Sequence, residues 1–248
     1  GIYARVAPPA FKASGGKDSP VLEGTEVTYG IDNHAVQFMI EERGVNAGFW
    51  RAVGPGYTKF AIETLIDEVA QGVGADPLAY RVQLLEKTPR GAAVLKEVGK
   101  MANWGRALPA GRALGLAYSD AWNTFVGMIA EVSMENGQPR VHQVWAAVDC
   151  GHALQPRNIQ AQIEGSVMFG LSAALHERIT LKDGEPQETN LNGYSILRAS
   201  EAPLVHVNVM PTDNHPGGIG EAGLPPIAPA VANAVAKLTG KRLRTLPL

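Results

Sequence analysis

Apolar residues in the first half of the chain recur with the spacing of α-helices. Over residues 57–72 they fall at every third or fourth position, which places them on one face of a helix that nearby glycines end. Asp76 is typical of a helix N-cap, because Pro77 follows at the first helical position. A third apolar stripe lies between residues 94 and 105. The pattern therefore predicts a helical layer over residues 57–104.

After the helical layer the pattern changes to runs typical of β-strands. Residues 124–134 and 140–148 are rich in apolar and β-branched side chains, and the Asn136-Gly137 pair between them strongly favours a tight hairpin. Beyond it we expect, in order, a helix over 157–175, a hairpin at Asp183-Gly184, a strand over 204–210, a loop over 211–224 and a helix over 226–238. This order favours an α+β fold, with mixed sheets and packed helices, over a repeating βαβ fold.

Glycine and proline suggest a division of the chain into three parts. The sequence has 28 glycines and 17 prolines, and those near the start interrupt any sustained period. We interpret residues 1–30 as an extended lead-in, residues 31–110 as a helical subdomain with a glycine-rich loop, and residues 111–248 as an α+β subdomain. Because the chain starts at Gly1 and not at Met, we expect a processed or truncated chain, or one piece of a longer protein.

Composition excludes several classes of function. Of the 248 residues, 45% are hydrophobic and 19% charged, and the formal net charge is −2, so we expect no nucleic-acid-binding surface. The single cysteine, Cys150, cannot form an internal disulfide or supply the thiolates of an iron–sulfur cluster. No apolar run approaches the ~18 residues of a membrane span, and no signal segment opens the chain.

The glycine-rich loop over residues 218–223 matches the G-x-G-x-x-G expression of dinucleotide-binding turns. We expect no such site, because a long loop separates it from the preceding strand and Glu221 is the last acidic residue, which leaves none to hold a ribose. Glycines on both sides of Glu221 instead let a cofactor approach the backbone while one carboxylate projects as a general base. A surface turn with a solvated glutamate is the alternative.

Two further segments each have a functional and a structural interpretation. Arg51 follows two aromatic residues and precedes a glycine-rich turn, an arrangement that suits an anion, whereas an arginine packed over Trp50 is the alternative. The Asp-Cys-Gly-His run at residues 149–152 matches no metal-ligand spacing, so we interpret it as a strand end with a buried thiol. The chain has no H-x-x-x-H pair, no G-x-S-x-G and no P-loop, so we expect neither a zinc site nor a common hydrolase.

Several segments together carry a resemblance that no single motif carries. They are Val148-Asp149-Cys150-Gly151, Gln160-Ala161-Gln162-Ile163-Glu164-Gly165, Phe169-Gly170-Leu171 and Gly217-Gly218-Ile219-Gly220-Glu221-Ala222-Gly223-Leu224-Pro225-Pro226. From about Asn46 to Leu248 the chain resembles the molybdenum-binding subunit of the xanthine dehydrogenase/aldehyde oxidase family. The nearest branch contains isoquinoline 1-oxidoreductase beta subunits and the large subunits of membrane-associated bacterial aldehyde dehydrogenases. The resemblance implies a molybdopterin-binding domain that forms about the last third of a longer polypeptide.

The resemblance implies a role for Glu221. It matches the family's catalytic glutamate, the general base that takes the proton from a molybdenum-bound hydroxide while that oxygen attacks an electron-poor carbon. The implied activity is that of a molybdopterin-dependent oxidoreductase, a molybdenum hydroxylase that oxidises an aldehyde or an N-heterocycle with oxygen from water and needs the rest of its subunit. The alternatives are a non-catalytic module of the same fold that binds a partner or another ligand, and an NAD-binding dehydrogenase.

The resemblance also implies which residues bind the cofactor. They match the family's segments at the molybdenum end, beside the pterin and in the glycine-rich loop, and they are Trp50, Arg51, Ala52, Gln162, Gly218 and Gly220. Trp50 and Ala52 depart from the family's Phe-Arg-Gly pattern, which favours a role for the backbone of this segment. The family's other cofactor-binding segments are not found in the sequence, so we do not expect the chain alone to hold molybdenum.

Cofactors and partners follow from the same resemblance. It implies molybdopterin cytosine dinucleotide, with 2Fe-2S clusters in a separate small subunit, which agrees with the lone Cys150. The expected partners are the N-terminal portion of the molybdenum subunit, the iron–sulfur subunit and, as a further candidate, a cytochrome c subunit, together with a small-molecule substrate. Relatives in this branch are often exported, so we expect the periplasm or the periplasmic face of the inner membrane, with the cytoplasm as the alternative.

Overall fold

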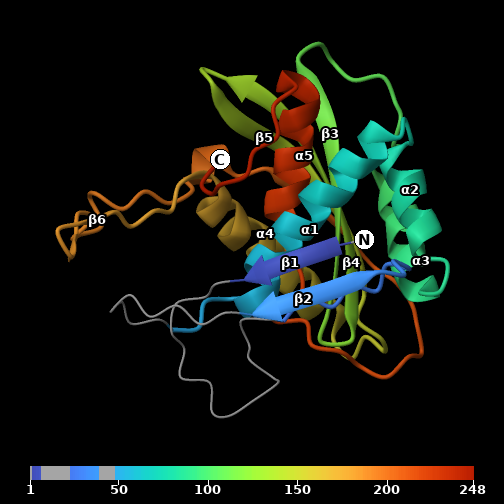
Figure 1. The fold of residues 1–248 in the computed structure, drawn as a ribbon. Helices are drawn as coiled ribbons and strands as arrows, with labels where there is room; N and C mark the ends of the chain where they lie inside the picture. The colour runs from blue at the N-terminus through green and yellow to red at the C-terminus, as the bar shows by residue number, and fades with distance from the viewer. Residues whose placement is uncertain (1, 7–22, 39–47) are drawn as a thin grey trace.

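A four-stranded sheet forms the centre of the molecule, seen in a computed structural model that describes residues 2–6, 23–38 and 48–248 (Figure 1). Three strands run antiparallel, β3 (Arg112–Ala121), β4 (Thr124–Glu135) and β5 (Gln138–Asp149), and β8 (Leu204–Val209) pairs with β5 in parallel. Both hairpins turn through two residues with positive φ, Trp122-Asn123 and Asn136-Gly137, as tight type I′ turns require.

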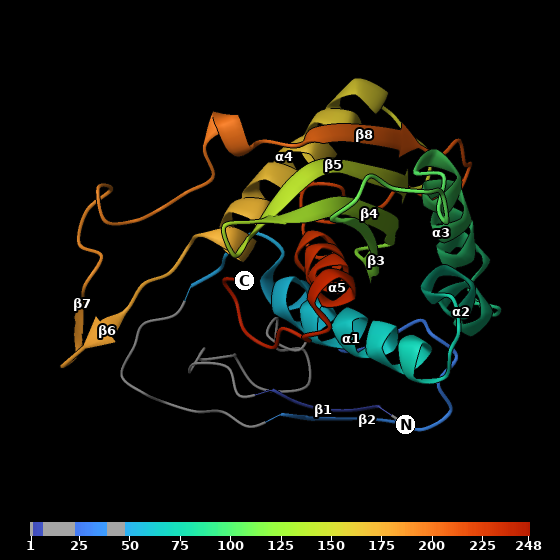
Figure 2. The ribbon, with the colours of Figure 1, turned by 90° about the horizontal axis from the view of Figure 1, so that it is seen from above.

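Helices cover both faces of this sheet (Figure 2). On one face, α4 (Pro156–Leu175) and α5 (Ile227–Thr239) bury one apolar core against the sheet. On the other, α3 (Pro89–Met101) buries a second core together with α1 (Val53–Gly72) and the end of α2 (Pro77–Leu84). Alternate residues of the strands contribute to the two cores, as the period of two in a β-strand requires.

Two strand glycines let helices approach the sheet closely. A Cβ at Gly115 would lie 2.1 Å from the carbonyl oxygen of Ala230 in α5, and one at Gly127 would lie 2.8 Å from the carbonyl oxygen of Val94 in α3. Any side chain at either position would force a helix away from the sheet, because interiors are close-packed.

A buried polar cluster fixes α1 against its neighbours. Glu63 of α1 accepts hydrogen bonds from the hydroxyl of Tyr29 at 2.8 Å, from Nε of Arg81 at 2.9 Å and from the backbone N–H of Tyr118 at 2.9 Å. Arg81 is fully buried. Because both carboxylate oxygens and the guanidinium have partners, the cost of burying these charges is offset, and the middle of α1 is held in a definite place.

Most of the predicted elements are confirmed. The helices over 57–72, 157–175 and 226–238, both hairpins and the strand over 204–210 lie within two to four residues of the observed bounds. Asp76 caps α2 by accepting from the N–H groups of Leu78 and Ala79. The third helix begins earlier than its apolar stripe indicates, because Pro89 opens it at the first helical position. The α+β class is also confirmed.

Three strands lie outside the predicted set. β1 (Ile2–Val6) and β2 (His34–Phe38) form a separate parallel pair, and β3 is the first strand of the central sheet. A small hairpin of β6 (Leu181–Lys182) and β7 (Glu185–Pro186) and a short 3₁₀ helix (Ala199–Glu201) are the remaining elements of the described residues. The predicted division at residues 30 and 110 stays a prediction. In the parts of the chain that the structure describes, no helix is long and apolar enough to cross a bilayer.

Candidate functional site

Arg51 joins three segments that are far apart in the sequence. It precedes α1, and its Nε donates to the carbonyl oxygen of Gly220 at 2.8 Å, while Nη2 donates to the side-chain oxygen of Gln162 at 2.8 Å. Gln162 lies on the second turn of α4, and Gly220 lies in the loop between β8 and α5. The planar fork of a guanidinium suits such a connection between two acceptors. Partial burial lowers the pKa of Arg51, an effect that the nearby Glu221 opposes.

Glu221 is held at the start of α1. The backbone N–H of Ala52 donates to Oε1 of Glu221 at 2.9 Å, so one carboxylate oxygen is fixed beside the positive end of a 20-residue helix. The carbonyl of Glu221 accepts from the N–H of Leu224 at 3.0 Å, which fixes its backbone. Next to it, a Cβ at Gly220 would meet no atom of the described residues within 4 Å. Glu221 therefore follows a residue with open space beside it, on a backbone that is fixed by hydrogen bonds at Gly220 and Glu221.

The segment that leads to Glu221 is tied to the ends of three strands. The N–H of Gly218 donates to the carbonyl of Trp122 at 2.8 Å, and the hydroxyl of Thr124 donates to the carbonyl of Gly218 at 2.8 Å. On its other side, the N–H of Gly217 donates to the carbonyl of Cys150 at 2.8 Å. The loop over 211–218 is thus an ordered connection and not a free surface turn.

Buried Asp149 at the end of β5 strengthens this connection. Its oxygens accept from Nε and Nη2 of Arg90 at 2.8 Å each, from the N–H of Gly151 at 2.9 Å and from the hydroxyl of Thr212 at 3.0 Å. Burial opposes ionisation, but these donors outweigh it, so the pKa of Asp149 is lower than usual. Cys150 beside it is buried, as predicted, and burial raises the pKa of its thiol.

Aromatic side chains flank Arg51. Trp50 stacks on Phe169 of α4 with 5.0 Å between ring centroids, and the Arg51 guanidinium lies 5.9 Å from the Phe169 centroid. Both rings keep about two fifths of their surface exposed, and Phe49 is more exposed still. An exposed aromatic surface next to an arginine suits a flat, polar ligand.

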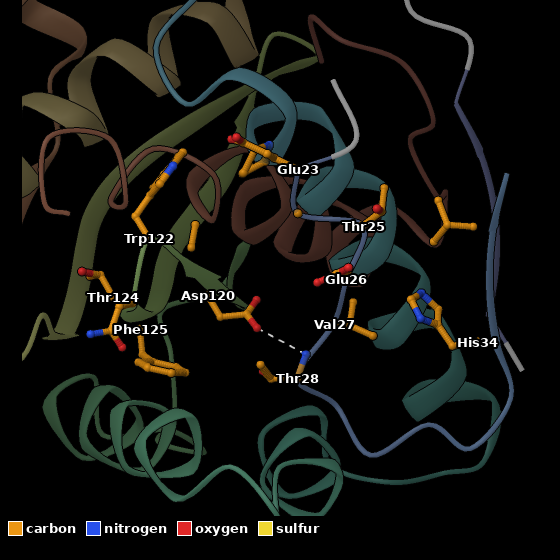
Figure 3. A pocket seen from close by; sticks show the side chains of 15 residues that line it. Glu23, Thr25, Glu26, Val27, Thr28, His34, Asp120, Trp122, Thr124 and Phe125 are labelled. Atoms are coloured by element: carbon orange, nitrogen blue, oxygen red, sulfur yellow. Dashed lines mark hydrogen bonds between the residues drawn. The ribbon is translucent and has the colours of Figure 1, made fainter. Parts of the chain in front are cut away.

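A cavity of about 850 Å³ opens beside the start of α1 (Figure 3). Its lining includes Glu23, Glu26, Trp122 and Phe125, and also Asp120, which accepts from the backbone N–H of Thr28 at 3.2 Å. Trp122 of the lining accepts from the N–H of Gly218, so the cavity lies next to the loop that leads to Glu221. Partial burial and the nearby Glu221 raise the pKa of Glu23. The sequence carries no signal for this cavity, because its lining comes from three separate segments.

The structure brings most of the predicted site residues together and leaves one apart. Trp50, Arg51, Ala52, Gln162, Gly220 and Glu221 form one cluster, which we call the Glu221 site. Gly218 lies against the β3–β4 turn, where a Cβ would approach the Cβ of Trp122 to 2.9 Å, so packing there accounts for this glycine. The functional roles of all seven residues stay predictions. Arg90, Asp149 and Thr212, which hold the loop, were not among them.

The Glu221 site fits one side of a large polar cofactor. Nη1 of Arg51 makes no hydrogen bond to the residues that the structure describes, the side of Gly220 is open, and the flanking rings are half-exposed. These groups offer a cationic donor, room beside the backbone and aromatic surface, which match the phosphates and rings of a pterin nucleotide.

Comparison with known proteins identifies relatives of the chain. Residues 95–203 match the family model of a molybdopterin cofactor-binding domain. The chain is similar to the isoquinoline 1-oxidoreductase subunit beta of Brevundimonas diminuta, with 38% identity over 99% of this chain and 32% of the relative. It is also similar to a membrane-bound aldehyde dehydrogenase of Gluconacetobacter polyoxogenes, with 31% identity over 84% of this chain and 30% of the relative. The chain thus spans about a third of the length of these relatives.

A solved structure shows the same fold. Quinoline 2-oxidoreductase from Pseudomonas putida 86 superposes with a TM-score of 0.83 at 13% identity, over 99% of this chain and 58% of that one. The predicted molybdopterin-binding fold is therefore confirmed. The family model and the two relatives place the chain in the molybdenum-binding subunits of the xanthine dehydrogenase/aldehyde oxidase family.

Proposed function

We propose that the chain forms the catalytic-base side of a molybdenum hydroxylase, which oxidises an aldehyde or an N-heterocycle with oxygen derived from water. The observation that carries the proposal is the position of Glu221. Its carboxylate accepts a hydrogen bond from the N–H of Ala52, the residue after Arg51, which is itself hydrogen-bonded to Gln162. The names of the relatives, which include an isoquinoline oxidoreductase and an aldehyde dehydrogenase, support oxidation of these two substrate classes.

The cofactor we propose is molybdopterin cytosine dinucleotide, and the Glu221 site would hold part of it. Molybdenum in this group supplies a two-electron redox centre. Arg51 would offer its remaining guanidinium N–H and Gln162 its side-chain amide, while Gly220 leaves room for close approach to the backbone. The name of the Gluconacetobacter relative includes pyrroloquinoline quinone, a different redox group, whereas the family model supports molybdopterin.

Glu221 would act as the general base. One carboxylate oxygen is fixed by Ala52, and the other can accept a proton from an oxygen nucleophile placed in the open space beside Gly220. The loop that carries Glu221 is tied to Trp122, Thr124 and Cys150, so the base keeps its position without help from substrate.

The partners we propose complete the cofactor site and the electron path. The remaining portion of the molybdenum subunit would close the Glu221 site from outside this chain. With one buried cysteine in the chain, 2Fe-2S clusters would lie in a small partner subunit, and a cytochrome c subunit is a further candidate acceptor. We place the enzyme in the periplasm or on the periplasmic face of the inner membrane.

The test replaces Glu221 by Gln in the assembled enzyme. Because an amide cannot accept the proton, we expect turnover of aldehydes and N-heterocycles to fall by about 10²–10⁴-fold while molybdenum content stays unchanged. Glu86→Gln, at an exposed position outside the site, is the matched control and should leave turnover unchanged.

Three results would contradict the proposal. Unchanged turnover in Glu221→Gln would remove the base assignment, and loss of molybdenum in that variant would assign Glu221 to cofactor binding. A wild-type enzyme that contains no molybdenum, or that has no oxidase or dehydrogenase activity, would favour the non-catalytic module.

A further inference from the structure

Residues 177–198, which we call the arm, project from the body of the protein between α4 and β8 (Figures 1 and 2). The β6–β7 hairpin lies at the outer end of the arm, far from the central sheet in both views. A long excursion of this kind that returns to the same sheet needs a reason, because loops in compact domains are mostly short.

The arm is ordered by contacts within itself. The N–H of Gln187 donates to the carbonyl of Thr180 at 2.8 Å, and the hydroxyl of Tyr194 donates to a carboxylate oxygen of Glu177 at 2.8 Å. At its base, the N–H of Leu197 donates to the hydroxyl of Ser172 in α4 at 3.0 Å. The arm therefore has a defined shape while most of its surface faces away from the body.

Aliphatic side chains on the arm are exposed. Leu191 is 82% exposed, and Ile179, Leu181 and Ile196 are about half-exposed. Ile179 and Leu191, with Tyr194, line a shallow hollow of about 530 Å³. A cluster of exposed aliphatic residues around a hollow is typical of a surface that is covered in the assembled protein.

We propose that the arm docks on the part of the molybdenum-binding subunit that lies outside this chain. The molybdopterin-binding family model covers residues 95–203 and thus the whole arm, and the Brevundimonas relative aligns over 99% of the chain. The arm therefore lies within the span that matches the molybdopterin-binding family model. The chain matches 32% of that relative, so in the relative a further stretch of polypeptide about twice as long as this chain is available to cover the arm.

The charges of the hairpin define the partner surface further. Residues 181–188 at the outer end of the arm carry Asp183, Glu185 and Glu188 against the single cation Lys182, so this end has a formal charge of 1 minus 3, or −2, next to the aliphatic hollow. Two copies of this chain that met at their arms would bring these like charges together, so a second copy is disfavoured. The fitting surface is an aliphatic patch that inserts one side chain into the hollow and carries Lys or Arg at its edge.

Site-specific photocrosslinking tests this docking in the assembled enzyme and does not depend on turnover, so its outcome is independent of the proposed role of Glu221. A benzophenone amino acid replaces Leu191, and the crosslinked peptides are identified by mass spectrometry. The control carries the same probe at Leu154, which is 78% exposed and lies outside the arm. We expect Leu191 to crosslink to the same subunit, at residues outside this chain.

Every other result overturns the inference. Crosslinks from Leu191 to a second copy of this chain, to the iron–sulfur subunit or to a cytochrome would name another occupant, and no crosslink would show an uncovered arm. A second measurement compares Leu191→Glu with Leu154→Glu. We expect the first variant to lower the yield of assembled enzyme at least tenfold and the second to leave it within twofold, and equal yields would also overturn the inference.

Discussion

Replacing Asp149 by Asn should destabilise the protein strongly and loosen the loop that carries Glu221. The Asp149 side chain is 3% exposed and accepts four hydrogen bonds, two of them from the Arg90 guanidinium. Asparagine keeps one acceptor oxygen, but its NH₂ group would face a donor N–H in place of the second oxygen. The substitution therefore removes both a charge and an acceptor at a buried site.

The magnitude follows from the exposure of the two partners. Removing one partner of a buried ion pair costs about 3–5 kcal/mol. Arg90 keeps 20% of its side-chain surface exposed, so water can solvate the guanidinium in part, and we expect a loss of about 2–4 kcal/mol. For a protein of this size, each kcal/mol shifts Tm by roughly 2–4 °C, so Tm should fall by about 4–16 °C.

Thermal unfolding followed by circular dichroism measures this change, and limited proteolysis reports on the loop over residues 211–218. Arg244→Gln is the matched control, because the Arg244–Glu68 pair is about half-exposed and should contribute less than ~1 kcal/mol. We expect cleavage in the loop to accelerate in Asp149→Asn alone. If the two variants unfold at the same temperature, or if the loop stays protected in both, Asp149 does not hold the loop in the way described.

Two further predictions concern acid and packing. The pKa values of Asp149 and Glu131 are lowered, because hydrogen bonds from Arg90 and from Arg106 and Arg112 outweigh burial. These ionised groups stabilise the fold fully above their unfolded-state pKa values near ~4, and this stability is lost as pH falls through their lower folded-state pKa values. We therefore expect Tm to drop steeply below about pH 4, and less steeply in Asp149→Asn. Parallel curves of Tm against pH for the two proteins would contradict this. Gly115→Ala places a Cβ 2.1 Å from the Ala230 carbonyl oxygen and should cost more than ~3 kcal/mol in denaturant unfolding, whereas Gly72→Ala, which meets no atom within 4 Å, should be neutral or stabilising.

Local signals in the sequence predict most of the helices, strands and turns. The elements that these signals miss depend on contacts between distant segments. Asp76 before Pro77 and Asn136-Gly137 each determine a cap or a turn within a few residues, so both can be read from short windows. β3 is not predicted because small residues such as Gly115 weaken its strand pattern. Gly115 makes room for the close packing of α5, which lies more than 100 residues later in the chain.

The residues of the Glu221 site can also be separated into those that the sequence predicts and those that only the structure reveals. The resemblance to a family suggests Arg51, Gln162 and Glu221 as one site. In the structure Arg51 bonds to Gln162 and to the residue before Glu221, and Glu221 bonds to the residue after Arg51. Nothing in a single sequence indicates that Arg90 would pair with Asp149, because such pairing depends on how α3 packs against the end of β5. Residues that match motifs can be predicted, whereas the residues that hold them in place need the folded structure.

Ala52 shows how backbone geometry connects the motif to the site. Its φ of 76° and the φ of 42° at Val53 lie in the left-handed region, where side chains with a Cβ are disfavoured. Such conformations cost about 1–3 kcal/mol each and persist where surrounding contacts impose them. Here the N–H of Ala52 must turn toward Glu221, and the carbonyl of Ala52 must accept from Gly56 to continue α1. The left-handed conformation of Ala52 is therefore part of the geometry that presents its N–H to the Glu221 carboxylate while its carbonyl accepts from the first turn of α1.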